Sequence, residues 1–369
     1  MNNFPKIIIS GGGTGGHIFP AIAIANALKV IVPNCEILFV GAKGRMEMEK
    51  VPAAGYQIVG LNISGIQRGA VLKNLTLPFK VISSVRKAST LIDNFKPNVV
   101  VGVGGYASGP LLYAASLKGI PYLIQEQNSY AGITNKWLGK KAAKICVAFD
   151  GMEAFFPAHV LLKTGNPVRK EVIDIKDKHF AGAELLKLDP LKKIILITGG
   201  SLGAGTLNKS IEKHLQELIA QDVQVVWQTG KFYYRGIIER LGADFHPNVH
   251  VLEFLNRMDL AYAAADLIIS RAGAGTIAEL CLIKKPVILV PSPNVAEDHQ
   301  TKNAMALIKN DAALLINDNS AVDTLVPEAL KLLQNKERCK TLSENIGNMA
   351  LPNADIIIAE EVLKLIKIN

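Results

Sequence analysis

A chain of 369 residues is long enough for two domains, and its 49% hydrophobic and 20% charged residues are typical of a globular protein rather than a disordered one. No apolar run approaches the roughly 18 residues of a membrane-spanning helix, and the first residues do not resemble a signal peptide. The four cysteines are widely spaced, which favours a reducing cytosol over a disulfide or zinc framework. Residues 1–150 carry 16 Lys and Arg against 6 Asp and Glu, which predicts an anionic partner for that part of the chain.

The chain is predicted to begin with a strand, a glycine loop and a helix. Residues 6–10 form an apolar, β-branched run, residues 11–16 are rich in glycine, and residues 18–30 alternate Ala with Ile and Leu as a buried helix does. Strands that alternate with helical patterns predict parallel βαβ units. Further strands are expected at residues 37–40, 99–103, 122–124 and 145–148.

The same order of strand, glycine loop and helix recurs at residues 193–219. We expect a boundary at the turn-rich segment 164–167, so that residues 1–165 and 166–350 form two doubly wound domains. Residues 351–369 are expected to form a closing helix that packs back toward the N-terminal domain. Two such domains would face a cleft along the carboxyl ends of their sheets, where these folds bind ligands. The later strands are expected at residues 223–227, 249–253, 267–270, 287–290 and 313–316.

The first glycine loop matches the GxGxxG pattern, in which backbone N–H groups approach a phosphate at a helix N-terminus. The second strand ends in residues 40–45 without the acid that binds the ribose of a nicotinamide cofactor, and no GxxxxGK[ST] motif occurs. Dinucleotide and P-loop functions are therefore disfavoured, and tight turns with no ligand are the alternative for each loop taken alone. His17 follows the first loop at a helix start, where the positive helix end favours a neutral imidazole. We predict that it is a general base, with packing or capping as the alternative.

A series of motifs in the same order resembles the MurG family of bacterial peptidoglycan N-acetylglucosaminyltransferases, which convert lipid I to lipid II. The chain departs from that pattern at Gln125, where relatives often carry His, and at Leu202, Leu255 and Gly275. The motifs are GGTGGHIFPA (12–21), GGYASGP (104–110), EQN (126–128), TNKWL (134–138), GNPVR (165–169), GGSLGA (199–204), RAGAGTIAE (271–279) and HQTKNA (299–304).

The resemblance implies the GT-B architecture, two Rossmann-like domains with parallel sheets, in which the C-terminal domain holds most of the UDP-N-acetylglucosamine (UDP-GlcNAc) donor. It implies that Glu279 accepts hydrogen bonds from the ribose hydroxyls and that Leu255 reads uracil through its main chain. Residues of the first loop would meet the donor from the N-terminal side. The other implied donor-binding residues are Thr14, Gly15, Gly16, Asn128, Arg169, Ser201, Ala274, Gly275, Thr276 and Gln300.

The implied reaction is an inverting transfer of GlcNAc to the 4-hydroxyl of muramic acid in lipid I. It needs a base, for which His17 is the first candidate and Glu126 the second, with an orienting hydrogen bond as the alternative role of Glu126. Gly104, Gly105 and Tyr106 are expected to cradle the diphosphate of the acceptor, with packing as the alternative for Tyr106. No two aspartates are spaced as DxD, so no resident metal site or cofactor is predicted, while a divalent cation such as Mg²⁺ bound with the diphosphates stays open.

Two acid-free, basic stretches predict a membrane-binding face. Residues 50–92 contain no Asp or Glu, and their apolar residues at helical spacing are flanked by Lys73, Lys80 and Lys87. Such a stripe favours peripheral binding to anionic lipid on the cytoplasmic face of the inner membrane, and an ordinary amphipathic helix with solvated lysines is the alternative. The apolar residues are Leu72, Leu75, Phe79 and Ile82, and the second stretch holds Lys136, Trp137, Lys140, Lys141 and Lys144.

Three other functions compete with this one. A UDP-GlcNAc epimerase would share the donor residues but needs no lipid acceptor or basic amphipathic face. A nicotinamide dehydrogenase is disfavoured by the missing ribose acid. A nucleic-acid binder would explain the charge, but the basic clusters lack interleaved aromatic residues, so no nucleic-acid partner is predicted. The sequence leaves the oligomeric state open.

Overall fold

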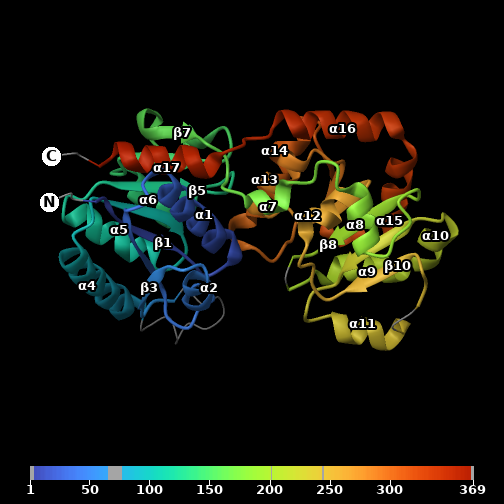
Figure 1. Cartoon of the computed structure of the whole chain (residues 1–369), viewed down its shortest axis with the longest axis horizontal. Coiled ribbons are helices and arrows are strands. Elements are labelled where there is room, and N and C mark those ends of the chain that lie inside the picture. Colours follow the sequence, from blue (N-terminus) through green and yellow to red (C-terminus); the bar gives the residue numbers. More distant parts are fainter. Residues whose placement is uncertain (1–3, 65–76, 201, 243–244, 367–369) are drawn as a thin grey trace. The chain divides into compact units, whose positions relative to one another are not determined.

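Figure 1 shows the computed structural model of the chain, which describes residues 4–64, 77–200, 202–242 and 245–366. The chain forms two compact units. The N-terminal unit comprises residues 1–168 together with residues 351–369, and the C-terminal unit comprises residues 169–350. Each unit has its own sheet and core, so each is described separately.

The N-terminal unit is built on a parallel sheet in the order β3-β2-β1-β4-β5-β6-β7. The predicted strands of this half are confirmed. The sequence pattern misses β3 and β7 at the two sheet edges, because β3 contains a glycine and β7 has only three residues. The strands are β1 (Lys6–Gly11), β2 (Glu36–Ala42), β3 (Gln57–Leu61), β4 (Val99–Gly104), β5 (Tyr122–Glu126), β6 (Lys144–Val147) and β7 (Leu161–Lys163).

Helices cover both faces of this sheet (Figure 1). Ile7 and Ile9 of β1 pack toward α1 and α17, whereas Ile8 packs toward α4, α5 and α6, as the alternation of side chains along a strand requires. Helix α17 lies against α1, so the C-terminal segment belongs to this unit. The helices are α1 (Gly15–Ile31), α2 (Glu47–Ala53), α4 (Leu77–Phe95), α5 (Ser108–Leu117), α6 (Ile133–Gly139), α17 (Ala354–Lys364) and the short 3₁₀ helices η1 (Met152–Ala154) and η2 (Ala158–Val160).

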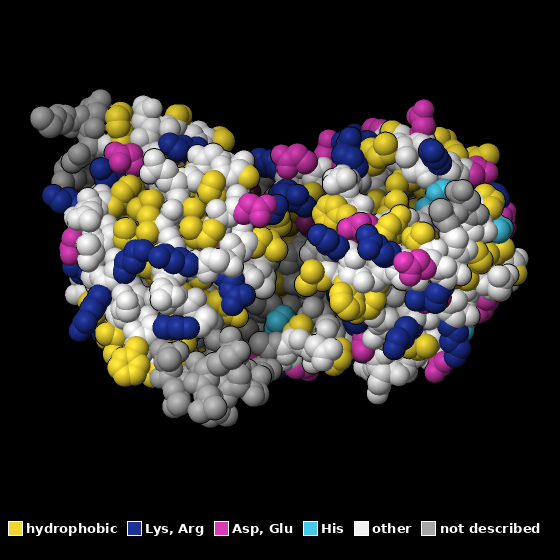
Figure 2. Space-filling view, turned by 90° about the horizontal axis from the view of Figure 1, so that it is seen from below, with side chains coloured by type: hydrophobic (Ala, Val, Ile, Leu, Met, Phe, Trp, Pro, Cys, Tyr) yellow, Lys and Arg dark blue, Asp and Glu magenta, His cyan; other side chains and the backbone are white. Residues whose placement is uncertain are grey.

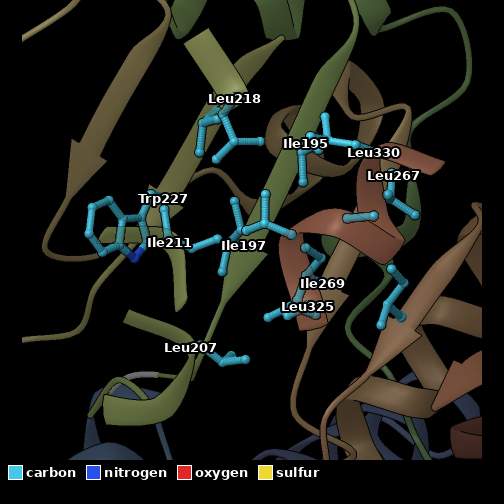
Figure 3. Close-up of a cluster of buried hydrophobic side chains, with 14 of the residues drawn as sticks. Ile195, Ile197, Leu207, Ile211, Leu218, Trp227, Leu267, Ile269, Leu325 and Leu330 are labelled. Atoms are coloured by element: carbon cyan, nitrogen blue, oxygen red, sulfur yellow. The ribbon is translucent and has the colours of Figure 1, made fainter. Parts of the chain in front are cut away.

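The C-terminal unit repeats the plan with a parallel sheet in the order β10-β9-β8-β11-β12-β13. Figure 3 shows its core, in which Ile195 and Ile197 of β8 and Leu267 and Ile269 of β11 pack with apolar side chains of the covering helices. The predicted strands of this half are also confirmed. They are β8 (Ile194–Thr198), β9 (Gln224–Gln228), β10 (Val249–Leu252), β11 (Leu267–Ser270), β12 (Val287–Leu289) and β13 (Leu314–Leu315).

The helix expected to run to residue 219 is instead two helices, which meet at His214. The break turns Leu215 and Leu218 into the core, where both are buried. The helices of this unit are α7 (Lys170–Ile173), α8 (His179–Leu185), α9 (Gly205–Lys213), α10 (Leu215–Ala220), α11 (Tyr234–Leu241), α12 (Met258–Ala264), α13 (Ala274–Ile283), η3 (Ala296–Asp298), α14 (His299–Ile308), α15 (Asp318–Gln334) and α16 (Lys336–Asn348).

Both sheets have the same strand order, 3-2-1-4-5-6 from the first strand of each unit, and this order determines where ligands bind. In such sheets the direction of winding reverses between the first and fourth strands, and the loops that leave these strands border a crevice at the carboxyl edge. In the N-terminal unit these are the loops after β1 and β4, and in the C-terminal unit the loops after β8 and β11. None of the helices in the described part of the chain is long and apolar enough to cross a membrane.

Candidate active site

The loops after β1 and β4 pack directly against each other. The N–H of Gly12 donates to the carbonyl of Gly104 at 3.3 Å, and a Cβ on Gly105 would lie 2.3 Å from the carbonyl oxygen of Gly12. Gly13, Gly104 and Gly105 all have positive φ. Glycine is therefore required here both by backbone conformation and by close approach.

His17 lies in the first turn of α1, above these loops. Its Nδ1 is 3.0 Å from the carbonyl oxygen of Gly12 and 3.3 Å from the hydroxyl of Thr14. Because a carbonyl can only accept, Nδ1 carries the proton, and the lone pair of the neutral ring is on Nε2. A Cβ on Gly104 would lie 2.6 Å from Cδ2 of the ring, so the glycine leaves room for the imidazole.

Tyr106 borders the same loops. Its ring would contact a side chain at Gly13, and the guanidinium of Arg45 lies 5.7 Å from the ring centroid. Thr14, Gly15 and Gly16 form the start of α1, whose first N–H groups have no partner within the helix. The predicted residues of the N-terminal unit thus gather at one carboxyl edge.

Glu126, at the end of β5, has a different environment. It is 3% exposed, and its carboxylate accepts hydrogen bonds from the N–H and side chain of Asn128, from the N–H of Gly132 and from the side chain of Asn135. Burial raises the pKa of the Glu126 carboxyl, while the hydrogen bonds from Asn135, Asn128 and Gly132 lower it. A carboxylate that already accepts four hydrogen bonds is suited to holding Asn128 and its loop, so we favour the orienting role over the base.

Glu47 is a residue of this site that sequence reasoning missed. It begins α2, five residues beyond β2, and its carboxylate accepts the N–H groups of Gly13 and Ala42. Glu47 lies two residues beyond the segment 40–45, which contains no acid. This acid faces the backbone of the first loop, and its oxygens are not directed to a ribose as in dinucleotide-binding proteins.

The loop after β8 in the C-terminal unit is a tight turn held by neutral groups. The N–H of Gly203 donates to the carbonyl of Gly200 at 2.9 Å, and both residues have positive φ. Behind the turn, the hydroxyl of Thr198 donates to the side chain of Gln228, whose amide donates to the carbonyl of Gly200. Ser201 lies outside the described residues.

The loop after β11 leads into the N-terminus of α13. Gly273 precedes the helix in an extended conformation, and the first turn holds Ala274, Gly275 and Thr276 with no acidic residue. A helix start of this kind favours an anion, because its N–H groups and the helix dipole both present positive potential. Arg271, just before it, donates to the carbonyls of Val290 and Pro291 and pairs with Asp318.

Glu279 lies further along α13 and has a hydrogen-bond partner that the sequence does not predict. The hydroxyl of Tyr262, which is 1% exposed, donates to Oε2 of Glu279 at 3.0 Å, and a carboxylate with one such bond can still accept further hydrogen bonds from a ligand. Desolvation raises the pKa of the Glu279 carboxyl, and the Tyr262 hydroxyl and the positive charge of Arg169 lower it. This arrangement is suited to accepting hydrogen bonds from hydroxyl groups.

The remaining donor-site residues of the C-terminal unit are Leu255 and Gln300. Leu255 is buried next to the exposed Phe254. Oε1 of Gln300 accepts the N–H of Ser292 at 2.8 Å, which holds the segment before η3. Among the described residues, no group of three or more His, Cys, Asp or Glu side chains lies together in a way that could hold a metal ion.

The basic stretches of the N-terminal unit lie in the layer of α4, α5 and α6. In α4 the buried face consists of Ser84, Ala88 and Ile92, whereas Phe79 is 75% exposed and Ile82 is also exposed. Figure 2 views the molecule from the side of α4 and shows Lys and Arg side chains among hydrophobic ones on this unit. Leu72, Lys73 and Leu75 of the expected stripe lie outside the described residues.

Most of the second basic cluster lies on and just after α6 in the same layer, whereas Lys144 begins β6 and pairs toward α17, which covers the opposite face of the sheet. Trp137 is 57% exposed, and its ring lies 5.2 Å from that of Tyr113 on α5. The ammonium group of Lys136 lies over the ring of Tyr130. Lys144 pairs with Glu361 of α17, so its charge is partly balanced within the unit.

The chain has two α/β units in this strand order, each with glycine loops at its carboxyl edge. This arrangement defines a two-domain enzyme of the GT-B class. Comparison with known proteins identifies the family. Residues 7–147 match the glycosyltransferase family 28 N-terminal domain, and residues 194–357 match the glycosyltransferase family 28 C-terminal domain. The chain belongs to glycosyltransferase family 28.

Several relatives are similar over nearly their whole length. A protein of Parabacteroides distasonis is 56% identical over 98% of both chains, and one of Bacteroides fragilis is 55% identical over 98% of this chain and 95% of its own. Both are named UDP-N-acetylglucosamine–N-acetylmuramyl-(pentapeptide) pyrophosphoryl-undecaprenol N-acetylglucosamine transferase.

Solved structures also resemble the chain. The crystal structure of Acinetobacter baumannii MurG has a TM-score of 0.78 and 29% identity, with 98% of this chain and 100% of that one covered. A Listeria monocytogenes protein described as a candidate UDP-N-acetylglucosamine 2-epimerase has a TM-score of 0.68 over 98% of this chain and 95% of its own, but is only 17% identical. The likeness to the second protein extends to the fold alone.

Proposed function

We infer that this chain transfers GlcNAc from UDP-GlcNAc to the 4-hydroxyl of N-acetylmuramic acid in lipid I, undecaprenyl-pyrophosphoryl-MurNAc-pentapeptide, and so forms lipid II and UDP. The observation that carries this inference is 56% identity over 98% of both chains to a transferase of that name. The epimerase alternative shares the fold at 17% identity and gains no support at the level of sequence.

The reaction is a displacement at C1 of the GlcNAc unit. The oxygen of the acceptor hydroxyl forms a bond to C1 on the face opposite the diphosphate, and the C1–O bond to UDP breaks with its electron pair on UDP. The configuration at C1 is inverted, which gives the β-1,4 linkage. We propose that Nε2 of His17 takes the hydroxyl proton, since the contact of Nδ1 with the Gly12 carbonyl fixes the ring in the tautomer that a base needs.

The C-terminal unit is the better site for the diphosphate of the donor. The turn after β8 is backed by Thr198 and Gln228, which are neutral, and the start of α13 adds the positive end of a helix dipole. The loop after β1 is backed by the carboxylate of Glu47 instead, which would repel an anion. In the proposed complex, the carboxylate of Glu279 accepts hydrogen bonds from the ribose hydroxyls, and the main chain of Leu255 recognises the uracil base.

The N-terminal unit is proposed to bind the acceptor and the membrane. Gly104, Gly105 and Tyr106 would contact the acceptor beside His17, and the carboxylate of Glu47 behind the adjoining loop disfavours their expected role as a cradle for the diphosphate of the acceptor. The exposed Phe79 and Ile82 with the neighbouring basic residues fit an anionic lipid surface, and each basic residue near such a surface adds about 1 kcal/mol of attraction. The protein would then act peripherally on the cytoplasmic face of the membrane, and its product would serve cell-wall growth, cell shape and division.

The function is tested by incubating the protein with UDP-GlcNAc labelled in the sugar and a synthetic lipid I analogue. Label in a lipid II product, with release of one UDP per transfer, is the expected result. Conversion of UDP-GlcNAc to its 2-epimer without a lipid product would overturn the proposal in favour of an epimerase.

The membrane face is tested separately by sedimentation with vesicles of phosphatidylglycerol and of phosphatidylcholine. We expect binding to the anionic vesicles and its loss in a Phe79→Ser, Ile82→Ser double variant. Leu191→Ser, which changes an even more exposed apolar residue of the C-terminal unit, is the control and should bind like the wild type. Equal binding by both variants would contradict the assignment of this face.

A further inference from the structure

Glu47 is a buried acid in the N-terminal unit with an unusual set of partners. It is 1% exposed, and each of its oxygens accepts one backbone N–H: Oε1 that of Ala42 at 2.9 Å and Oε2 that of Gly13 at 2.8 Å. No ion pair to Glu47 is present within the described residues. Within the described part of the chain, two backbone N–H groups are therefore what stabilises its charge, and burying a carboxylate without a cationic partner is costly.

The hydrogen bonds of Glu47 and His17 meet on a single peptide group. The N–H of Gly13 and the carbonyl of Gly12 belong to the same peptide bond. That peptide donates its N–H to Glu47 and accepts, through its oxygen, the Nδ1–H of His17 at 3.0 Å. The carboxylate, the peptide and the imidazole thus form one continuous chain of hydrogen bonds.

Glycines at two positions make room for this carboxylate. A Cβ on Gly12 would lie 2.2 Å from Oε1 of Glu47, and a Cβ on Gly41 would lie 2.5 Å from its Cγ. Any other residue at either position would displace the acid from the peptide. The glycines therefore serve the placement of Glu47 as well as the turn itself.

A carboxylate at one end of such a chain affects the base at the other end. Hydrogen bonds in series polarise one another, so the Gly12 carbonyl becomes a stronger acceptor when the N–H of the same peptide faces a negative charge. A stronger acceptor stabilises the Nδ1–H of His17 and the imidazolium that forms when Nε2 takes a proton. In serine proteases a carboxylate does this by direct contact with the histidine. Here a peptide group lies between the two.

The other charged groups around the loop do not supply this effect. Arg45, from the segment before α2, lies over the ring of Tyr106, and a cation there disfavours imidazolium. The first turn of α1 contains no acidic residue, and its positive dipole also disfavours imidazolium. Among the described residues around the loop, Glu47 is thus the acid that opposes both.

We propose that Glu47 is a positioning residue for the transfer reaction. Through the peptide between Gly12 and Gly13 it holds His17 with Nδ1 protonated and stabilises the imidazolium formed when Nε2 accepts the proton of the acceptor hydroxyl. The proposal rests on the proposed function of His17 as the base.

The test compares Glu47→Gln with Glu49→Gln in the full chain. The same chemical change is made two residues apart on α2, but Glu49 is exposed and pairs with the exposed Lys50. We expect Glu47→Gln to lower kcat about tenfold with little change in the KM for UDP-GlcNAc, because the group acts on the base and not on the donor. Glu49→Gln should match the wild type in both constants.

Nitrogen NMR of the ¹⁵N-histidine-labelled protein gives a readout independent of activity. The His17 signals are assigned by their absence in His17→Gln. In the wild type we expect the neutral ring to carry its proton on Nδ1, and in Glu47→Gln we expect the imidazole to protonate at lower pH than in the wild type and in Glu49→Gln.

Two results would overturn the proposal. One is the finding that the neutral ring of His17 in the wild type carries its proton on Nε2. This measurement is made on the wild type and does not depend on the folding of a variant. The other is an unshifted His17 titration in Glu47→Gln, which would leave the acid a purely structural role. If the transferase assay with the wild type fails while the NMR results are as expected, the proposed function fails and the hydrogen-bonded chain stands.

Discussion

The first loops of the two units have the same place in the topology but differ in the charge of the group behind them. Each follows the first strand of a sheet in the same order and leads into a helix. In the N-terminal unit the loop is backed by the carboxylate of Glu47, whereas in the C-terminal unit it is backed by Thr198 and Gln228. The place of the two loops in the topology is shared, whereas their positive-φ glycines (Gly13 in the first loop, Gly200 and Gly203 in the second) and the groups behind them differ.

This difference suggests how one fold can serve two roles in a single enzyme. A carboxylate behind the loop makes the site unfavourable for a phosphate but favourable for a histidine that must gain a proton. Neutral groups behind the loop leave the positive potential of the helix start available to a diphosphate. A glycine-rich loop after the first strand is therefore not by itself a sign of phosphate binding.

Among substitutions of residues that support the two loops and the donor site, the largest effect is expected from filling the contact between the two N-terminal loops. In Gly105→Ala the new Cβ would meet the carbonyl of Gly12, so the peptide that binds His17 must move, and a displacement of the base by about 1 Å can cost about 100-fold in rate. The transfer assay measures this loss. Gly55→Ala is the matched control, since Gly55 has nearly the same positive φ but open space around it. Equal rates in the two variants would show that the packing of the loops is unimportant.

A smaller effect is expected on donor binding as a function of pH. Desolvation raises the pKa of Glu279, and the ribose hydroxyls need its ionised form as acceptor, so UDP-GlcNAc affinity should weaken as the pH falls through that raised pKa. Calorimetric titration at several pH values measures this. Glu279→Gln should bind about tenfold more weakly near neutral pH and show a flatter pH dependence. A wild-type affinity that is constant in acid would contradict the role of Glu279.

The smallest effect is expected from Tyr262→Phe, which removes the hydroxyl that donates to Glu279. The loss of one hydrogen bond should weaken UDP-GlcNAc binding about fivefold. Because the Tyr262 hydroxyl lowers the pKa of Glu279, its removal should also move the acid limb of the binding curve to higher pH. If the affinity for UDP-GlcNAc fell by the same factor at every pH and the acid limb of the curve stayed in place, Tyr262 would only shape the pocket.

The fold could be predicted from sequence largely because buried parallel strands read as continuous apolar runs. Strands such as residues 194–198 and 267–270 are apolar on both faces and flanked by glycine or charged residues. The edge strands of the N-terminal sheet lack this signal, as β3 shows with Gly60 in its sequence. The break between α9 and α10 at His214 depends on how Leu215 and Leu218 reach the core, which periodicity alone does not express.

In the candidate site, the sequence predicts residues that lie in motifs and gives no sign of the residues that contact them from elsewhere in the chain. His17 and Glu279 were identified from their neighbours in the chain. Glu47 is 34 residues from Gly13, and Tyr262 is 17 residues from Glu279, so both contacts exist only once the sheet is formed. Hydrogen bonds between distant segments depend on register and helix placement, which one sequence does not reveal.

The measurement that tests the account most directly is made on His17→Ala, with turnover and UDP-GlcNAc affinity determined on the same preparation. The account predicts that kcat for lipid II formation falls by about 10²–10⁴, because a positioned base is lost, while the Kd for UDP-GlcNAc is unchanged, because the donor is bound by the C-terminal unit. Undiminished turnover would contradict the assignment of the base. A loss of donor affinity parallel to the loss of turnover would contradict the division of roles between the two loops.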